Sequence, residues 1–310
     1  MFFPSYTSST LTLTRQILRN FNAKPMMPNN PSERDHVPLQ AVIFDVDGTL
    51  ADTELDGHRV AFNRAFDEFG LDWHWSPEGY GELLAVTGGK ERIRHYAKTH
   101  APELLGQVDI DTWVARLHQL KSEIYSRLVL AGAIPLRPGI ARLIHELREA
   151  GTRIAVATTT TPSSLRSLIS VNFRHEMMSL FEVIGAGDVV AHKKPAPDIY
   201  QWVLRQMNLP PEACLAIEDS HAGLLAARAA GLPTLITVNS YTAGQNFSGA
   251  LSVISDLGEP HAPARNLDGL PLDGQFVDLA QLRVWHQQRP KPSPPQKSKL
   301  ADPPSALQPT

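Results

Sequence analysis

The sequence contains a single cysteine in 310 residues, Cys214, and this scarcity limits the covalent chemistry of the chain. One thiol cannot form an internal disulfide bond or supply a cysteine-based metal cluster within one chain. Because Cys214 lies in the apolar run ACLAIED, we expect a buried structural thiol rather than a nucleophile. The low cysteine content is typical of a reducing compartment.

Strong net charge and long apolar runs are likewise missing. The formal net charge is -3 and the pI is about 6.5, so the chain as a whole does not attract nucleic acid or an anionic membrane. No stretch approaches the roughly eighteen consecutive apolar residues of a membrane-spanning helix. We therefore expect a small-molecule partner rather than nucleic acid or a membrane, and we expect a monomer.

Both ends of the chain differ in composition from its middle. Residues 1–37 predict a disordered or transit-like leader, because the first 32 residues are rich in Ser and Thr and contain three basic residues but no Asp or Glu. Alternatively, Met26 or Met27 marks the true start. The expected location is therefore cytoplasmic, or the plastid stroma if the leader is a transit peptide. Residues 289–310 are rich in Pro, Ser and Lys and predict a disordered tail.

Between these ends, short apolar runs alternate with helical patterns. This alternation predicts an α/β fold with a mostly parallel, Rossmann-like sheet. Helical periodicity is clear in residues 138–151, 197–208 and 221–231. The predicted strands are Leu39–Asp45, Arg153–Thr158, Glu182–Ala186, Ala213–Glu218 and Thr234–Val238.

One long segment, residues 53–134, interrupts the alternation. It has no strand pattern, and its apolar residues recur at helical spacing, as at Phe62 and Phe66. We predict a small all-helical cap inserted after the first strand, able to move as a unit against the sheet domain. The expected catalytic core then comprises residues 38–52 and 135–258, followed by an extension at 259–288 that packs on it.

Polar residues follow the predicted strands at the edge where parallel strands end, which is where open sheets of this type bind ligands. Crowded carboxylates repel each other, and a divalent cation relieves the repulsion. Oxygen ligands favour Mg²⁺, which commonly binds phosphate, so the pattern indicates phosphoryl chemistry. The residues are Asp45, Asp47, Gly48 and Thr49 after the first strand, Thr158, Thr159 and Thr160 at the second, Lys194 after the third, and Glu218 and Asp219 at the fourth.

In this interpretation the polar groups have different tasks. One aspartate attacks phosphorus to form an aspartyl phosphate, and a carboxyl two residues further on gives a proton to the leaving alcohol and later takes one from water. A lysine and a hydroxyl neutralise the oxygens of the transferring group. Each motif alone is typical of an ordinary turn, cap or loop. Their joint occurrence, in order at strand ends, favours the catalytic interpretation.

The motifs FDVDGT, AVATTT, KKPAPD and AIEDS resemble those of the haloacid dehalogenase-like hydrolases over roughly residues 38–256. The helical insert resembles the small α-helical cap of that superfamily. The resemblance implies that Asp45 is the nucleophile and Asp47 the general acid/base. It also implies that Mg²⁺ is held by the Asp45 carboxylate, the Asp47 main-chain carbonyl and Asp219, that Glu218 supports the metal or its water shell, and that Thr158 and Lys194 hold the phosphoryl group with Thr159 and Thr160 beside them.

A narrower resemblance is carried by DTELDGHRVAFNRAF, ELLAVTGGKERI and SYTAGQNFSGA, which resemble the CbbY group, a group similar to β-phosphoglucomutase in layout. It implies removal of the C1 phosphate of xylulose 1,5-bisphosphate, a misfire product that inhibits Rubisco in the Calvin cycle, to give xylulose 5-phosphate. It also implies that Glu54 and His58 face the substrate, although His58 stands one residue further from the nucleophile than in some relatives.

The segment TGGKERI predicts an anion site in the cap. Gly88 and Gly89 let backbone approach a ligand closely, and Lys90 and Arg92 follow at an apparent helix start, where amide groups and the helix dipole favour an anion. We predict that Lys90 holds the second phosphate of a bisphosphate. The alternative is an ordinary glycine-containing turn with surface charges.

Other functions remain open on the sequence alone. A β-phosphoglucomutase-like mutase would use the same core and return the phosphoryl group to the sugar, and a phosphatase for another sugar phosphate would share every motif. A receiver-like switch phosphorylated on aspartate also gathers acidic groups, a Thr and a Lys at strand ends. However, a small receiver has no need of a helical insert of some eighty residues.

Overall fold

The structure is a computed structural model, and it describes residues 37–86, 88–103, 109–173, 179, 181–187 and 189–289. Apart from Arg289, the predicted tail at 289–310 lies outside the described residues, and so does the predicted leader at 1–37 apart from Val37. Every element described below belongs to one unit that starts at Pro38.

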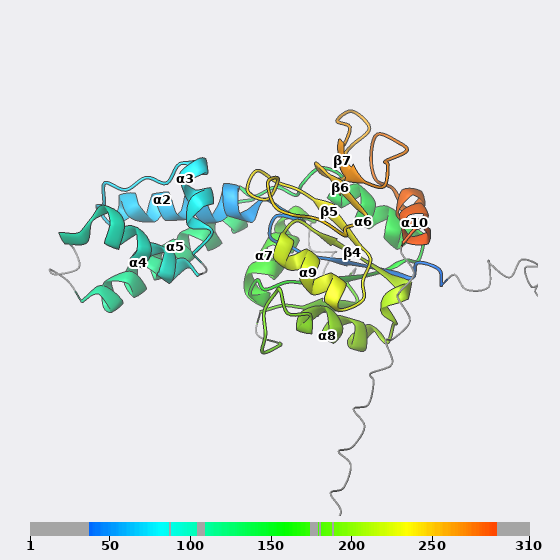
Figure 1. The fold of residues 1–310 in the computed structure, drawn as a ribbon. Helices are drawn as coiled ribbons and strands as arrows, with labels where there is room; N and C mark the ends of the chain where they lie inside the picture. The colour runs from blue at the N-terminus through cyan, green and yellow to red at the C-terminus, as the bar shows by residue number, and fades with distance from the viewer. Residues whose placement is uncertain are drawn as a thin grey trace, which may run out of the picture. The chain divides into compact units, whose positions relative to one another are not determined.

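A seven-stranded sheet forms the core, in the order β3-β2-β1-β4-β5-β6-β7 (Figure 1). All neighbouring strands are parallel except β6 and β7. The apolar run that forms β1 is buried on both sides, as expected for a central parallel strand. The strands are β1 Ala41–Phe44, β2 Arg153–Ala157, β3 Val183–Gly185, β4 Cys214–Glu218, β5 Thr234–Thr237, β6 Ser252–Ile254 and β7 Asn266–Gly269.

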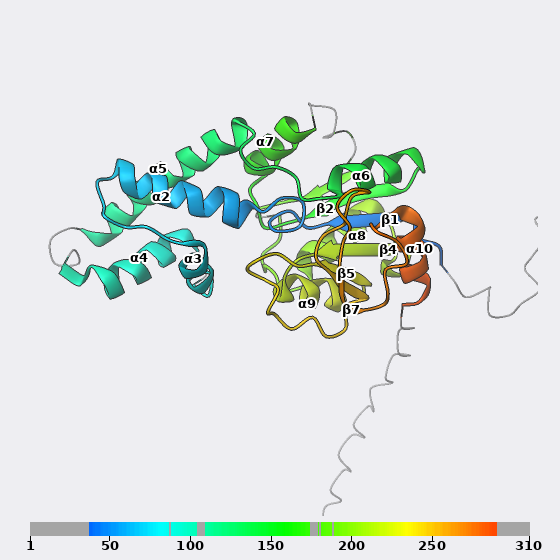
Figure 2. The ribbon, with the colours of Figure 1, turned by 90° about the horizontal axis from the view of Figure 1, so that it is seen from above.

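Helices cover both faces of this sheet (Figure 2). Side chains of α6, α7 and α10 pack with Val42 and Phe44 of β1, whereas those of α8 and α9 pack with Ala41 and Ile43 on the opposite face. The α/β class with a parallel, Rossmann-like core is therefore confirmed. The core helices are α6 Ile140–Glu149, α7 Pro162–Asn172, α8 Asp198–Met207, the short 3₁₀ helix η6 Pro211–Ala213, α9 His221–Ala229 and α10 Leu279–Gln287.

The insert after β1 is helical, as predicted, and the described part of residues 53–134 contains no strand. Phe62 and Phe66 of α2 are buried against Leu117 and Ile124 of α5. The insert meets the core where α5 packs on α7, and the Asn172 side-chain amide donates a hydrogen bond to the carbonyl of Ile134 at 3.1 Å. Its helices are the π-helix η3 Thr53–His58, α2 Arg59–Glu68, α3 Pro77–Leu83, α4 Gly89–His100 and α5 Ile110–Leu130.

The predicted strands are correct in place but too long by one to three residues. The hydrogen-bonded ladder of β1, for example, ends at Phe44, so Asp45 lies just beyond the strand. Two further strands, β6 and β7, were not predicted from the sequence. The chain beyond residue 258 supplies β7 and α10, and Leu282 and Trp285 of α10 are fully buried.

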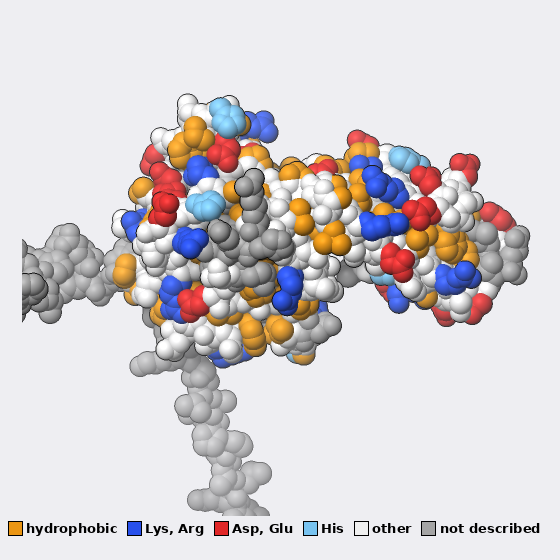
Figure 3. Space-filling view, turned by 180° about the vertical axis from the view of Figure 1, so that it is seen from behind, with side chains coloured by type: hydrophobic (Ala, Val, Ile, Leu, Met, Phe, Trp, Pro, Cys, Tyr) orange, Lys and Arg blue, Asp and Glu red, His pale blue; other side chains and the backbone are white. Residues whose placement is uncertain are grey.

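The surface carries charges of both signs. On the face shown in Figure 3, Lys and Arg side chains are interspersed with Asp and Glu over the insert. Among the helices of the described ranges, none combines the length and the apolar character needed to cross a membrane.

Candidate active site

Asp45 stands at the carboxyl end of the central strand. The β1 ladder pairs with β2 on one side and β4 on the other, and the amide of Asp45 still donates to the carbonyl of Ile217 at 3.0 Å. The strand therefore fixes the backbone of Asp45, and its side chain is buried at the sheet edge. Parallel pairing brings the ends of β2 and β4 to the same edge, which is why groups far apart in the chain meet here.

Three carboxylates converge at this edge. Asp45, Glu218 and Asp219 each place an oxygen within 4.8 Å of the others, and all three are buried. Burial raises the pKa of Asp45 to about 8 and that of Asp219 well above its usual range, and the neighbouring carboxylates add to both shifts. Ionising the cluster therefore requires more positive charge than the nearby lysine supplies. A buried set of oxygen donors with this deficit fits Mg²⁺.

Lys194 is the cation built into the cluster. Its ammonium lies 2.5 Å from Asp45 Oδ1 and 2.5 Å from Glu218 Oε1, and it donates to the carbonyl of Ala157 at 2.9 Å. The Tyr200 hydroxyl donates to the same Glu218 oxygen at 2.6 Å. Because Glu218 is fully buried and its Oε1 accepts from both Lys194 and Tyr200, it anchors Lys194 beside Asp45.

Asp219 is held from the loop after β5. The Asn239 amide donates to Asp219 Oδ2 at 2.7 Å. Gly48, with φ +87°, packs against this contact, and an added Cβ there would stand 2.2 Å from Asp219 Oδ2 and 2.6 Å from Asn239 Nδ2. A side chain at this position would be strained and would displace Asp219, so glycine is required here.

Asp47 is oriented by two hydroxyl groups. Thr53, the first residue of the insert, donates to Asp47 Oδ1 at 2.6 Å, and Thr160, after β2, donates to Asp47 Oδ2. Thr158 is buried, and its hydroxyl accepts a hydrogen bond from the amide of Thr160 at 3.1 Å. The proposed proton shuttle thus contacts both the core and the start of the insert.

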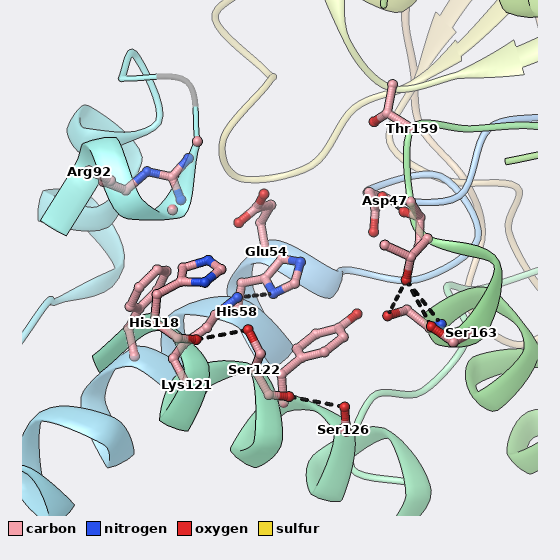
Figure 4. Close-up of a pocket in the computed structure, with 17 residues that line it drawn as sticks. Asp47, Glu54, His58, Arg92, His118, Lys121, Ser122, Ser126, Thr159 and Ser163 are labelled. Carbon is pink, nitrogen blue, oxygen red and sulfur yellow. Dashed lines mark hydrogen bonds between the residues drawn. The ribbon is translucent and has the colours of Figure 1, made fainter. Parts of the chain in front are cut away.

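A cavity of about 650 Å³ extends from Asp47 into the insert (Figure 4). The sequence-predicted residues that line it are Asp47, Glu54, His58, Gly88, Gly89, Arg92, Thr159 and Thr160.

Lys90 does not line this cavity, and the expectation that it holds a second phosphate is not supported by its position. Gly89 and Arg92 lie one helical turn apart on the face of α4 that lines the cavity. Lys90 lies on another face of the same helix, and its side chain is exposed.

Glu54 is braced from two other helices of the insert. The Tyr80 hydroxyl of α3 donates to Glu54 Oε2 at 2.5 Å, and Arg92 of α4 donates to that hydroxyl at 2.8 Å and to the carbonyl of Leu83 at 3.1 Å. Burial raises the pKa of Glu54, while the Tyr80 hydrogen bond and the Arg92 charge oppose the rise. The carboxylate therefore has a fixed orientation toward the cavity.

Lys121 of α5 is the other buried cation of the cavity. Its ammonium lies 2.8 Å from His58 Nδ1, and burial lowers its pKa to about 8. His58 stacks on Tyr125 with ring centroids 4.1 Å apart. Burial, with Lys121 and Arg92 nearby, lowers the pKa of His58 well below its usual range, so the ring is neutral at pH 7.

The family assignment follows from a match over most of the core. Residues 39–231 match the family model described as haloacid dehalogenase-like hydrolase. The chain is a haloacid dehalogenase-like hydrolase. Protein CbbY of Cupriavidus necator is 47% identical to it over 249 residues, covering 80% of this chain and 97% of the relative. Protein CbbY of Rhodobacter capsulatus is 49% identical over 219 residues, covering 71% and 94%. The hydrolase therefore belongs to the CbbY group and is an enzyme of the phosphoric monoester hydrolase class.

Solved structures agree with this placement. The crystal structure of CbbY from Rhodobacter sphaeroides in complex with phosphate superposes with a TM-score of 0.60 at 45% identity, covering 70% of this chain and 94% of that one. A mutant of the same protein in complex with xylulose-(1,5)bisphosphate gives a TM-score of 0.60 at 44% identity, with the same coverage.

Lys121, Tyr80 and Asn239 of the hydrolase were missed by the sequence analysis. The sequence carries a signal for Lys121. It lies four residues after Leu117 and three before Ile124, within the buried stripe of α5, where a lysine has no structural reason to be. Tyr80 and Asn239 carry no comparable signal, because each acts through a contact made only in the folded chain.

Proposed function

We propose that this hydrolase removes one phosphate from a sugar bisphosphate, with xylulose 1,5-bisphosphate as the substrate and xylulose 5-phosphate and inorganic phosphate as products. The observation that carries the proposal is the charge distribution in the cavity. Asp47 lines it at the sheet edge of the core, and two buried cations, Arg92 and Lys121, line it in the insert. A substrate with two phosphates matches this arrangement. The complex of the related Rhodobacter sphaeroides protein with xylulose-(1,5)bisphosphate supports the choice of sugar.

In the first half of the reaction, a carboxylate oxygen of Asp45 attacks the phosphorus of the C1 phosphate. The bond between phosphorus and the C1 oxygen breaks, and Asp47 gives its proton to that oxygen as the sugar leaves. In the second half, Asp47 takes a proton from water, the water oxygen attacks phosphorus, and the aspartyl phosphate is cleaved to Asp45 and phosphate. Thr53 and Thr160 donate to the two oxygens of Asp47, which fixes the orientation of this carboxyl group for the transfer.

Mg²⁺ is the proposed cofactor. Asp45 and Asp219, with the main-chain carbonyl of Asp47, would hold the ion. Glu218 would support the site by holding Lys194 beside Asp45. The ion supplies charge that offsets the negative oxygens of the phosphoryl group. Lys194 and the Thr158 hydroxyl neutralise the same group from the side of β2.

The second phosphate is assigned to Lys121 and Arg92 in place of Lys90. Both side chains are buried and line the cavity, so their charge acts in a medium where little water screens it. Arg92 uses two of its nitrogens on Tyr80 and Leu83. Lys121 has donors left beyond its contact with His58, since an ammonium group has three.

The test is phosphate release by the purified protein with Mg²⁺ from xylulose 1,5-bisphosphate, compared with a panel of sugar monophosphates and bisphosphates. We expect the highest kcat/KM on xylulose 1,5-bisphosphate and no release by Asp45→Asn, which keeps the side-chain shape but removes the nucleophile. Isomer formation from β-glucose 1-phosphate without phosphate release would establish the mutase instead. A higher kcat/KM on another sugar phosphate would reject this substrate but keep the reaction.

A further inference from the structure

The loop that follows β5 reaches the insert on a side of the site away from α7. In Figure 1 this loop, drawn in yellow, extends from the end of β5 toward the helices of the insert. Its Tyr241 ring meets the Tyr80 ring of α3 edge to face, with centroids 5.9 Å apart. Among the residues that the structure describes, this is the one ring-to-ring contact that joins insert and core.

A glycine in α3 makes the contact close. An added Cβ at Gly81 would lie 3.0 Å from Cδ1 and 3.2 Å from Cε1 of the Tyr241 ring, which is tighter than ordinary van der Waals contact. By contrast, a Cβ at Gly79, in the same helix, would meet only the Ser76 hydroxyl at 3.5 Å. The lack of space at Gly81 is therefore caused by the Tyr241 ring and not by the helix itself.

The turn that carries Tyr241 also carries the residue that holds Asp219. Asn239 donates from its side chain to Asp219 Oδ2 at 2.7 Å and accepts from the amide of Tyr241 at 2.9 Å. At the other end of the contact, Tyr80 donates to Glu54 at 2.5 Å. These contacts connect a proposed metal ligand of the core, Asp219, to a proposed substrate-facing carboxylate of the insert, Glu54.

We propose that Tyr241 is a positioning residue, whose ring sets the placement of α3, and with it Glu54, over the catalytic edge. The ring, not the hydroxyl, performs this task, because the buried Tyr241 oxygen has no hydrogen-bond partner among the described residues. The inference rests on the proposed function, in which the insert recognises the sugar. It predicts that the contact matters for a substrate that fills the cavity and not for a small phosphate ester.

The experiment compares Tyr241→Ala and Tyr241→Phe on xylulose 1,5-bisphosphate and on p-nitrophenyl phosphate. For Tyr241→Ala we expect kcat/KM on the bisphosphate to fall about tenfold, mainly through KM, with p-nitrophenyl phosphate within about twofold of the unchanged protein. Tyr241→Phe keeps the ring and should restore the bisphosphate value. An equal loss on both substrates, or a failure of Tyr241→Phe to restore activity, would overturn the positioning role.

Gly81→Ala tests the other side of the contact, with Gly79→Ala as the matched control in the same helix. We expect Gly81→Ala to lower kcat/KM on the bisphosphate and Gly79→Ala to leave it unchanged. In a Tyr241→Ala background, Gly81→Ala should add no further loss, because the ring it displaces is already gone. Additive losses would show that Gly81 acts independently of Tyr241 and would reject the proposal.

A measurement without substrate separates this inference from the proposed function. Amide hydrogen exchange in α3 should be faster in Tyr241→Ala than in the unchanged protein and in Tyr241→Phe, because α3 loses its contact with the core. This result would stand even if xylulose 1,5-bisphosphate were not hydrolysed. Unchanged exchange in α3 would show that the ring does not position it.

Discussion

Lys121 is the residue on which the recognition of a second phosphate depends most. Replacing it with Met removes the charge and keeps an unbranched chain of similar length. We expect kcat/KM on xylulose 1,5-bisphosphate to fall about 10- to 100-fold, because a charge-assisted hydrogen bond contributes roughly 1.5–3 kcal/mol. Steady-state kinetics on the bisphosphate and on p-nitrophenyl phosphate would measure the effect, and the small ester should be hydrolysed as before.

Lys90→Met is the matched control for this change. Lys90 is exposed and does not line the cavity, so its loss should change kcat/KM on the bisphosphate by less than about twofold. A large loss in Lys90→Met with none in Lys121→Met would restore the assignment made from the TGGKERI motif.

The titration of Lys121 predicts a pH dependence of bisphosphate hydrolysis. Burial lowers the pKa of Lys121 to about 8, so the ammonium form is present at pH 7 and is lost as the pH rises through about 8. We expect kcat/KM on the bisphosphate to fall above this pH, while the profile on p-nitrophenyl phosphate keeps its shape. Lys121→Arg keeps its charge throughout this range, and the fall near pH 8 should disappear. A fall that persists in Lys121→Arg would assign the titration to another group.

The residues at the sheet edge were predictable because topology alone brings them together. Asp45, Thr158 and Glu218 end or follow three adjacent parallel strands, and buried apolar runs mark such strands in the sequence. Lys121 was not predictable in the same way. It meets His58 across 63 residues of sequence, and that contact depends on how α5 packs against the helices that follow β1.

At the scale of elements, the strands that sequence reasoning missed are those with the weakest local signal. The β6 strand has three residues, and its place is set by pairing with β5. The β7 strand reads NLDG, is exposed along its whole length, and exists through its antiparallel pairing with β6. Periodicity reports burial, so an exposed edge strand of this kind leaves no trace in it.

The α10 helix gives a prediction about the extension that follows residue 258. Trp285 is fully buried and donates from Nε1 to the carbonyl of Pro271 at 2.9 Å. We expect Trp285→Ala to lower the free energy of unfolding by about 3–5 kcal/mol, as large-to-small changes in a core do. Urea denaturation would measure the loss.

Val284, next to Trp285 in the same helix, is 37% exposed and supplies the control. Val284→Ala should change the free energy of unfolding by no more than about 0.5 kcal/mol. Equal effects of the two substitutions would show that the extension is not part of the core.

For the whole molecule, the acidic edge ties stability to metal binding. Burying Asp45 and Asp219 beside Glu218 disfavours their charged forms, and a bound Mg²⁺ favours them only in the folded chain, since the unfolded chain does not hold the three together. We therefore expect Mg²⁺ to raise the Tm and EDTA to reverse the rise. At a Mg²⁺ concentration 100 times the Kd, the free energy of unfolding should increase by roughly 2.7 kcal/mol.

Asp219→Asn decides whether this gain comes from the proposed site. The substitution removes one carboxylate but keeps a side-chain oxygen of similar size, so the fold should persist. Its Tm should not respond to Mg²⁺, because the charge that attracts the ion is reduced. Differential scanning calorimetry of both proteins with Mg²⁺ and with EDTA would measure the two responses. An equal Mg²⁺-dependent rise of the Tm in Asp219→Asn and in the unchanged protein would show that the ion binds elsewhere. The buried carboxylates would then lack the cation that offsets the cost of their burial.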